Sequence, residues 1–306
     1  MEYRPLSTTG FSFSVLGLGT WGMSGVDWGP FQPTEATRIL RIALDAGVNW
    51  LDTSESFGSG RSEEVIGQAL QWLGVRDRLW LCGTVAGHHA SPDQIRKALE
   101  GSLRRLHTDH LDVYQLGWPN PTVPLSESLE ALMTLRQEGK ILAIGLANFP
   151  VELVRRACEL APIASIQALY NLFEREAELD LLPFCREHGI AFLAHSPLAQ
   201  GLLAGEFSLS SRPGPSNYRA HRALFQEGVY EEAVKATEQI ERVAARQASH
   251  AGQAALAWVL DQPGVTAAIV GVRRSEHLKQ SLLALHCTLT QQERNALRRL
   301  GESVLP

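Results

Sequence analysis

A regular alternation of short apolar runs with longer segments of helical periodicity constrains this chain more than any other feature. Runs such as residues 48–51, 79–82 and 111–116 have the length of buried strands. The segments between the runs repeat apolar residues every three to four positions, as amphipathic helices do. Eight such strand–helix units follow one another, whereas a doubly wound sheet more often has about five or six strands. We therefore predict an α/β fold, a single (β/α)8 TIM barrel.

The ends of the chain add smaller elements to this pattern. Residues 3–19 alternate weakly around Thr9-Gly10 and predict a β-hairpin that leads into the first barrel strand. Residues 291–304 predict an extra C-terminal helix. Residues 203–228 interrupt the alternation with glycines and prolines, and loops of this length are usually functional. Because no linker divides the chain, we predict one domain over residues 1–306.

Composition narrows the partners that we expect. The formal net charge of -5 offers no basic patch, so nucleic acid is not expected as a partner. No apolar run reaches the roughly 18 residues that a membrane span needs, and the first thirty residues do not resemble a signal peptide. We expect a soluble, cytoplasmic protein with no membrane partner. The four cysteines lie far apart, so we expect reduced structural thiols and no metal site.

A candidate active site begins where the run at residues 48–51 ends in Asp52. A polar, glycine-bearing loop follows, and helical spacing resumes at Arg61. In a parallel barrel, chemistry takes place at the ends where strands pass into such loops. Glu55 lies three residues further on, so the two carboxylates are a candidate pair with separated pKa values. His88 and His89 also fall on a loop, and we expect both to be solvated.

Two glycine-bearing segments are candidate sites for phosphate groups. Residues 17–22 spell GxGxxG, but no helix opens directly after them and no acid follows about 20 residues on, so a dinucleotide-binding fold is not indicated. Gly271 ends a predicted strand, Arg273 and Arg274 follow, and a helix begins at Ser275. A helix N-terminus with two arginines suits a phosphate, although in isolation a capped helix with two solvated arginines is the favoured explanation of the pattern. The position after the eighth strand favours phosphate.

Motifs between Tyr3 and Leu285 resemble those of the aldo-keto reductase family. They are Leu16-Gly-Leu-Gly-Thr-Trp-Gly22, Gly47-Val-Asn-Trp-Leu-Asp-Thr53, Gly60-Arg-Ser-Glu-Glu64, Leu111-Asp-Val-Tyr-Gln-Leu116 with Trp118-Pro119, Gly145 to Phe149, Ser196-Pro-Leu-Ala-Gln-Gly-Leu-Leu203 and the arginine loop after the eighth strand. The resemblance implies a barrel that binds NADPH in an extended form and reduces carbonyl groups.

The resemblance also implies four catalytic positions, and this chain retains one of them. Asp52 matches the aspartate of the family. Phe57 stands where the family has its tyrosine acid, Thr84 where a lysine lowers the pKa of that tyrosine, and Gly117 where a histidine orients the substrate. General acid catalysis contributes roughly 10² to 10⁴ in rate. A chain with this degenerate tetrad is therefore expected to reduce ordinary carbonyls weakly or not at all.

The cofactor implied by the resemblance is NADP(H). The implied cofactor-binding residues are Thr20, Trp21, Asn148, Gln167, His195, Ser196, Leu198, Gln200, Gly201, Gly271, Arg273, Arg274 and Ser281. Three departures predict a reduced affinity: Ala147 replaces a serine, His195 replaces an aromatic ring that stacks on nicotinamide, and Ser281 replaces an asparagine near adenine. The arginine pair favours a 2′-phosphate.

Three hypotheses about function follow. The first is an atypical NADP(H)-dependent oxidoreductase that acts on an already activated C=N or C=C bond. The second is a redox-neutral lyase or isomerase that uses Asp52 with Glu55 or His195. The third is a pseudoenzyme, a non-catalytic NADP(H)-binding or scaffold protein. In each case we expect a small molecule at the C-terminal face of the barrel, and the sequence leaves the oligomeric state open.

Overall fold

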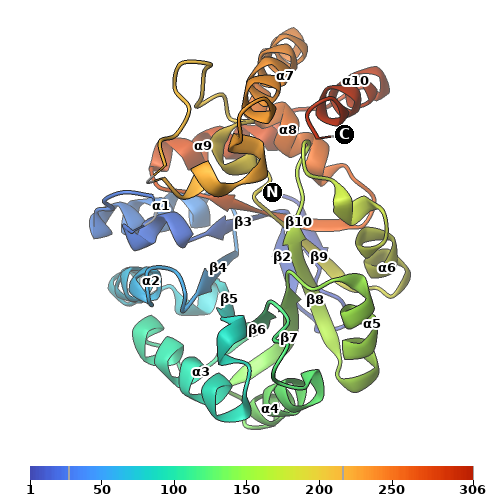
Figure 1. The fold of residues 1–306 in the computed structure, drawn as a ribbon. Coiled ribbons are helices and arrows are strands. Elements are labelled where there is room, and N and C mark those ends of the chain that lie inside the picture. The colour runs from blue at the N-terminus through green and yellow to red at the C-terminus, as the bar shows by residue number, and fades with distance from the viewer. Residues whose placement is uncertain (27, 216, 306) are drawn as a thin grey trace.

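Parallel strands close into a barrel in the computed structural model, which describes residues 1–26, 28–215 and 217–305. Position 216 of the predicted loop and position 306 of the predicted domain lie outside the described residues. The strands follow the order β10-β3-β4-β5-β6-β7-β8-β9 around the barrel, and helices surround them (Figure 1). Their bounds are β3 (Leu16–Gly19), β4 (Trp50–Ser54), β5 (Trp80–Val85), β6 (Leu111–Gly117), β7 (Ile141–Ala147), β8 (Ile163–Leu169), β9 (Ala191–His195) and β10 (Val265–Gly271). The predicted (β/α)8 barrel is confirmed.

Each barrel strand is followed by at least one α-helix. The helices are α1 (Pro33–Asp45), α2 (Arg61–Leu73), α3 (Pro92–Leu106), α4 (Leu125–Gln137), α5 (Val151–Leu160), α6 (Leu181–Glu187), α7 (Val229–Ala244), α8 (Ala251–Leu260), α9 (Ser275–Leu283) and α10 (Gln291–Glu302). Both α7 and α8 lie between β9 and β10, and α10 is the predicted extra helix at the C-terminus. Among the described residues, no helix is both long and apolar enough to cross a membrane.

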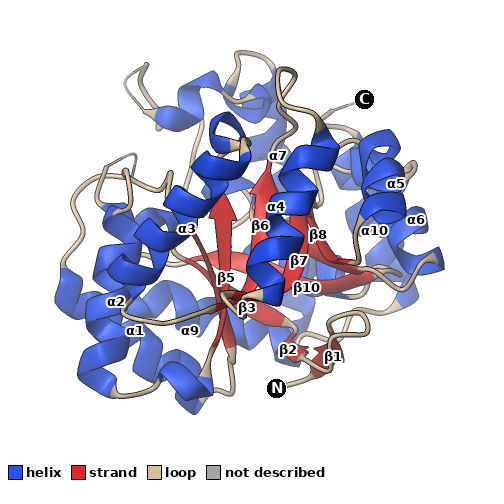
Figure 2. Cartoon of the chain, turned by 90° about the horizontal axis from the view of Figure 1, so that it is seen from below, coloured by secondary structure: helices blue, strands red, loops and turns tan. Residues whose placement is uncertain are grey.

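An N-terminal hairpin closes the end of the barrel at which the strands begin (Figure 2). Its strands are β1 (Tyr3–Pro5) and β2 (Ser12–Ser14), which pair antiparallel. The ring of Phe13 stacks on that of Trp50 at 4.7 Å between centroids, and Trp50 Nε1 donates to the carbonyl of Ser14 at 2.8 Å. The hairpin and the barrel share an apolar interior cluster of Leu6, Phe13, Trp50, Cys82, Val113, Ala143, Ala164, Ala191, Leu193, Ala267 and Ile269. Apolar side chains therefore fill the end of the barrel beside the hairpin, and the opposite end, where the strands finish, is left for a site.

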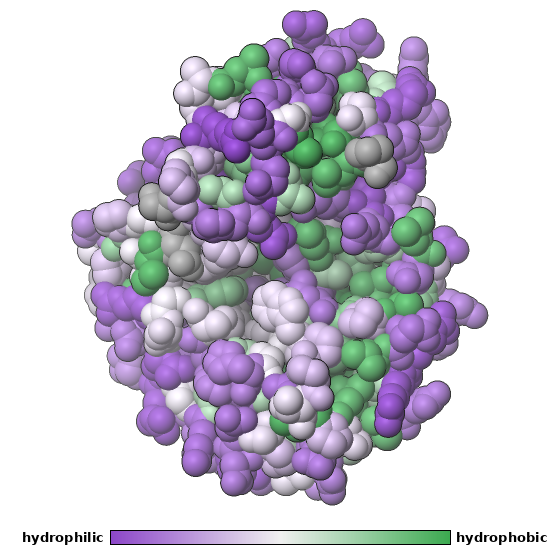
Figure 3. All heavy atoms as spheres, viewed as in Figure 1, coloured by the Kyte–Doolittle hydropathy of each residue, from purple (hydrophilic) through white to green (hydrophobic). Residues whose placement is uncertain are grey.

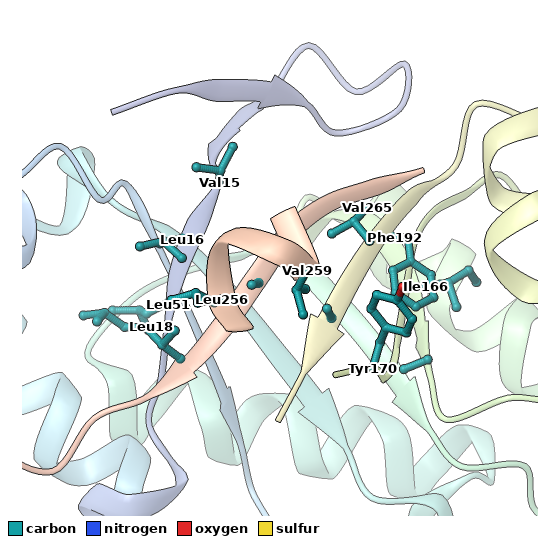
Figure 4. Packing of buried hydrophobic residues seen from close by; sticks show 14 of the residues in the cluster. Val15, Leu16, Leu18, Leu51, Ile166, Tyr170, Phe192, Leu256, Val259 and Val265 are labelled. Atoms are coloured by element: carbon teal, nitrogen blue, oxygen red, sulfur yellow. The ribbon is translucent and has the colours of Figure 1, made fainter. Parts of the chain in front are cut away.

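A second apolar layer lies between the strands and the helices. Leu256 and Val259 of α8 lie next to β10 in Figure 4, with Leu16 and Leu51 on one side and Phe192 on the other. Residues 253–260 of α8 are all buried, as expected for a helix that is apolar on every side. This layer fixes the strands, and with them the loops that carry the candidate site.

Two strands extend further than the apolar runs predicted. β4 ends at Ser54 rather than at residue 51, and β5 ends at Val85 rather than at residue 82. The reason is the backbone ladder, which continues past the apolar residues and pairs Ser54 with Thr84. Asp52 therefore lies inside a strand and not at its end, which corrects the prediction. The predicted loop at 203–228 is also partly ordered, because it contains short 3-10 helices at Tyr218–His221 and Ala223–Phe225.

Gly17 gives a test of the barrel interior. A Cβ atom at Gly17 would lie 2.2 Å from the Trp50 ring. Gly17→Ala should therefore destabilise the fold by about 1–3 kcal/mol or more, the range for overpacked cores. Gly214→Ala is the matched control, because a Cβ there meets no atom within 4 Å. Urea unfolding of both variants measures the difference, and equal stabilities would contradict the close packing of Trp50 against β3.

Candidate active site

Asp52 is held by two glutamine side chains near the C-terminal end of the barrel. Its Oδ1 accepts a hydrogen bond from Gln167 Nε2 at 2.7 Å and one from Gln115 Nε2 at 3.2 Å. Gln115 Nε2 also lies 3.1 Å from Thr84 Oγ1. These side chains come from β4, β5, β6 and β8, so they form a polar layer above the apolar interior. Gly145 on β7 leaves space for it, because a Cβ there would lie 2.9 Å from Gln115 Cγ.

The carboxyl group of Asp52 has an unusual protonation equilibrium. Burial raises the pKa of Asp52 from 3.8 to about 7, and the hydrogen bonds from Gln167 and Gln115 offset part of this rise. No arginine or lysine among the described residues forms an ion pair with Asp52. Both hydrogen bonds from the glutamine amides go to Oδ1. Oδ2 is therefore the oxygen without a hydrogen-bond partner in the described part of the chain. A proton on Asp52 would therefore reside on Oδ2.

Aromatic rings surround Phe57, which stands at the predicted position of the tyrosine acid. The rings of Phe57 and Trp21 stack at 5.7 Å with an interplanar angle of 17°. Trp21 also contacts Trp28 and Tyr218 edge-on, at 5.0 and 4.7 Å. Tyr218 belongs to the 203–228 segment, so this long connection reaches back to the loop after β3. We call Trp21, Trp28, Phe57 and Tyr218 the aromatic cluster. The phenyl ring of Phe57 itself carries no proton that it could donate.

Gly117 lies where a histidine was expected from the resemblance, and the backbone there is tightly packed. A Cβ atom at Gly117 would lie 2.8 Å from both Thr84 Cγ2 and the carbonyl oxygen of Val85. A larger residue would therefore require β5 or β6 to shift. Trp118 follows in the left-handed conformation, with φ of 58°, and is 57% exposed.

Glu55 contacts the loop after β5, and its hydrogen-bond partners differ from those of Asp52. Its Oε1 accepts from the backbone N–H of Ala86 at 3.0 Å and lies 2.8 Å from His89 Nδ1. The expectation that His89 is merely solvated is therefore wrong, because this ring is fixed by a carboxylate. His88 is exposed, as predicted, and its ring lies 4.1 Å from that of His89. The two carboxylates share no hydrogen-bond partner, so these contacts do not support the Asp52–Glu55 pair.

His195 and Asn148 are joined at the ends of β9 and β7. His195 Nε2 lies 2.8 Å from Asn148 Oδ1, and because that oxygen can only accept, Nε2 carries the proton. Burial, with a smaller effect from the charge of Arg222, lowers the pKa of His195 to about 4. The imidazole is therefore neutral at pH 7.

The amides of Asn148 and Gln167 each keep one free polar atom. The backbone N–H of Asn148 donates to the carbonyl of Gln167 at 2.8 Å, so the two residues are neighbours. With Asn148 Oδ1 and Gln167 Nε2 already bonded, Asn148 Nδ2 and Gln167 Oε1 have no partner within the described ranges. A free donor and a free acceptor on these neighbouring residues can complement a primary carboxamide, the group that nicotinamide carries on its reactive ring. The chain therefore fits this part of the cofactor.

The other predicted cofactor-binding residues fall into two groups. Ser196, Leu198, Gln200 and Gly201 form one turn after β9, in which Ser196, Gln200 and Gly201 have positive φ. Gln200 Oε1 is buried and has no hydrogen-bond partner among the residues that the structure describes, and the backbone carbonyl of Gln200 accepts from Arg219 Nε at 2.8 Å. Gly271 and Arg274 are exposed, and Arg273 is half-buried after β10.

Thr20 and Ser281 are both buried and form hydrogen bonds within the protein. Thr20 is fully buried, and its hydroxyl donates to the backbone carbonyl of Asp52 at 3.0 Å. Thr20 therefore positions β4, and we remove it from the cofactor set. Ser281 is 8% exposed and donates to the carbonyl of His277 within α9.

Sequence reasoning missed the role of Gln115. Its only signal is a single amide within the otherwise apolar end of the β6 run. In the view down the barrel, the face of the molecule is hollowed near its centre, with hydrophilic side chains around the outside (Figure 3).

Comparisons with known proteins agree over nearly the whole chain. The model of the Aldo/keto reductase family matches residues 15–302. Aldo-keto reductase YhdN of Bacillus subtilis is 34% identical, over 100% of this chain and 95% of the relative. The NADH-specific methylglyoxal reductase of Escherichia coli is 32% identical, over 99% of each chain. An aldo/keto reductase from Klebsiella pneumoniae, solved in complex with NADP and acetate, has a TM-score of 0.77 at 34% identity, covering 94% of this chain and 92% of its own.

Asp52 gives a prediction about pH. Because the folded chain holds this proton up to about pH 7 and the unfolded chain only to about 3.8, the stability it contributes is complete below pH 3.8 and is lost as pH rises through about 7. Asp52→Asn keeps an acceptor for both glutamines but cannot ionise. We expect the variant to be more stable than the parent at pH 8 but not at pH 4, by at most about 4 kcal/mol at about 1.4 kcal/mol per pKa unit. Urea unfolding at both pH values measures this, and a difference that does not change with pH would contradict it.

Proposed function

The chain belongs to the aldo/keto reductase family, and from this premise we propose an NADP(H)-dependent oxidoreductase whose acceptor is already activated, an iminium ion or a polarised C=C bond. Family membership makes the chain an oxidoreductase of the aldo-keto reductase type. The finer proposal, with little or no reduction of ordinary carbonyls, rests on the geometry around Asp52.

The observation that carries this proposal is the neutral surrounding of Asp52. A simple carbonyl that accepts a hydride becomes an alkoxide, which needs a proton donor or a nearby cation. The described residues offer Phe57, Thr84 and Gly117 at the three positions where such groups were expected. The Asp52 carboxylate itself is bonded to amides instead of a cation. An iminium carbon that accepts a hydride becomes a neutral amine, so it needs no acid.

The aromatic cluster supports a cationic or planar acceptor. Cations are attracted to the faces of tryptophan and phenylalanine rings. Asp52 contributes negative charge near the same mouth once it is ionised. Both features favour an iminium over an uncharged carbonyl.

Hydride addition to a polarised C=C bond gives a delocalised enolate, which is far less basic than an alkoxide and takes up one proton at carbon after the hydride has been transferred. Asp52 is the proposed source of that later proton. Its Oδ2 is free of protein partners in the described residues, and the pKa of about 7 keeps it partly protonated at neutral pH. Reduction of a C=C bond should therefore slow as pH rises through about 7.

The proposed cofactor residues fit NADP(H) at the nicotinamide end. When bound, the cofactor supplies the hydride. Asn148 Nδ2 and Gln167 Oε1 would hold the carboxamide, and the turn at residues 196–201 would hold the pyrophosphate. Arg273 and Arg274 are the proposed partners of the 2′-phosphate. The NADP complex of the related Klebsiella pneumoniae protein supports this choice.

A redox-neutral lyase or isomerase is the second candidate. Burial pushes the pKa values of Asp52 and His195 in opposite directions, to about 7 and about 4. Groups separated in this way can act as acid and base. A third candidate, a non-catalytic NADP(H)-binding protein, is distinguished by turnover. For each candidate we propose a small molecule at the C-terminal face of the barrel as the ligand, and the cytoplasmic location stays a prediction.

Asn148 tests the nicotinamide fit. Asn148→Asp retains the oxygen that accepts from His195 but replaces the free Nδ2 donor with an acceptor. We expect NADPH to bind at least about tenfold more weakly, since a lost charge-assisted or neutral hydrogen bond costs about 1–3 kcal/mol. Calorimetric titration measures the dissociation constant. Asn295→Asp on the exposed face of α10 is the matched control. Equal affinities of the two variants would show that Asn148 does not contact the cofactor.

Turnover tests the acceptor class. With NADPH, a preformed N-alkylated cyclic iminium salt should be reduced about 10² to 10⁴ times faster than an aromatic aldehyde, the range attributed to a missing general acid. Absorbance at the NADPH band follows both reactions. Aldehyde turnover at about 1 to 10³ per second, the ordinary enzyme range, would contradict the proposal. NADPH binding without oxidation by either substrate would favour the redox-neutral or non-catalytic candidates.

A further inference from the structure

The N-terminus of α9 already holds a carboxylate. The backbone N–H of Ser275, the first residue of α9, donates to Glu35 Oε1 at 2.7 Å. Glu35 lies in the first turn of α1, 240 residues away in sequence. Free N–H groups and the helix dipole make such an end attractive to anions. Here the protein itself supplies the anion.

The two arginines proposed for the 2′-phosphate also have protein partners. Arg273 Nη2 donates to the backbone carbonyls of Gly29 and Pro30, at 3.2 and 3.1 Å. Arg274 Nε donates to His277 Nε2 at 3.0 Å. A phosphate at this end would therefore have to exchange existing hydrogen bonds for its own.

The positive charge of the two arginines at this end of the site is also partly compensated by nearby carboxylates. The negative charge of Glu206 acts on Arg273 and on His277, whose pKa is lowered chiefly by burial. Glu35 adds a second carboxylate in direct contact with the helix end. A doubly charged phosphate would meet repulsion from both, whereas a ribose hydroxyl carries no charge and can donate to a carboxylate oxygen.

We propose that Glu35 is a specificity-determining residue that disfavours the 2′-phosphate of NADP(H) and accepts the 2′-hydroxyl of NAD(H). Its carboxylate occupies the Ser275 N–H that a phosphate would use. This inference rests on the proposed function, because it concerns the adenosine end of the same cofactor site. The chain therefore uses both cofactors, with a preference for NADP(H) smaller than the arginine pair alone would give.

The test compares NADPH and NADH binding to the full chain. Glu35→Gln removes the charge and keeps the side-chain length, and the dissociation constants are measured by calorimetry or by quenching of tryptophan fluorescence. The NADPH constant should fall at least about tenfold, the effect of one charge-assisted contact, while the NADH constant stays equal or rises. Glu127→Gln, at the first turn of α4, makes the same chemical change away from this end and should leave the ratio of the two constants unchanged.

A ratio that is the same in the parent and in Glu35→Gln would overturn the inference while leaving the proposed function intact. If the parent binds neither cofactor, the proposed function fails, and the inference fails with it. Should Glu35→Gln not fold, Glu35→Asp keeps the charge at α1 but withdraws the carboxylate from Ser275 by one methylene. That variant should shift the ratio in the same direction by a smaller factor, and an unshifted ratio would again refute the role of Glu35.

Discussion

A buried carboxylate held by two neutral amides determines what this site can do. In water Asp52 would be ionised above pH 4, but within the barrel Gln115 and Gln167 are the only hydrogen-bond donors to its side chain among the described residues. Two amide hydrogen bonds do not replace a cation in a medium of low dielectric, so the pKa rises to about 7. The residue that would serve as a fixed anion beside a lysine becomes a group that gains and loses a proton near neutral pH.

Two residues that depart from the family pattern, Phe57 and Gly117, are closely packed against their neighbours. Phe57 stacks on Trp21, and that ring in turn contacts Tyr218 from the long connection after β9. At Gly117 the space for a side chain is taken by Thr84 and by the backbone of Val85. Because the carbonyl oxygen of Val85 would lie 2.8 Å from a Cβ atom at position 117, a histidine there requires movement of the backbone. Neighbouring side chains and backbone therefore pack closely around both positions.

Much of the fold follows from the sequence, because periodicity and strand length report directly on which faces are buried. The barrel, the hairpin and α10 were predictable in this way. The ends of β4 and β5 were not, since backbone pairing continues beyond the apolar residues to Ser54 and Thr84. The resemblance pointed to Asp52 and to three departures from the family pattern, and these stay predictions. It gave no access to side-chain directions in loops, so the contact of Glu55 with His89 and the inward turn of Thr20 were missed.

The contacts between the first and last strands of the barrel leave no pattern in the sequence, and yet they position residues of the candidate site. β10 pairs with β3, which brings α9 beside α1 and makes the contact between Glu35 and Ser275 possible. No local pattern marks Glu35, because an acid in the first turn of a helix is ordinary on its own. Because the barrel closes, the N-terminus of α9 lies next to Glu35, and the carboxylate of Glu35 can accept a hydrogen bond from it. The same closure places Arg273 over Gly22 and against the loop at residues 29–30. The proposed nicotinamide end is thus set by neighbouring strands, whose order the sequence predicts. The proposed adenosine end is set by the junction between the first strand of the barrel and the last.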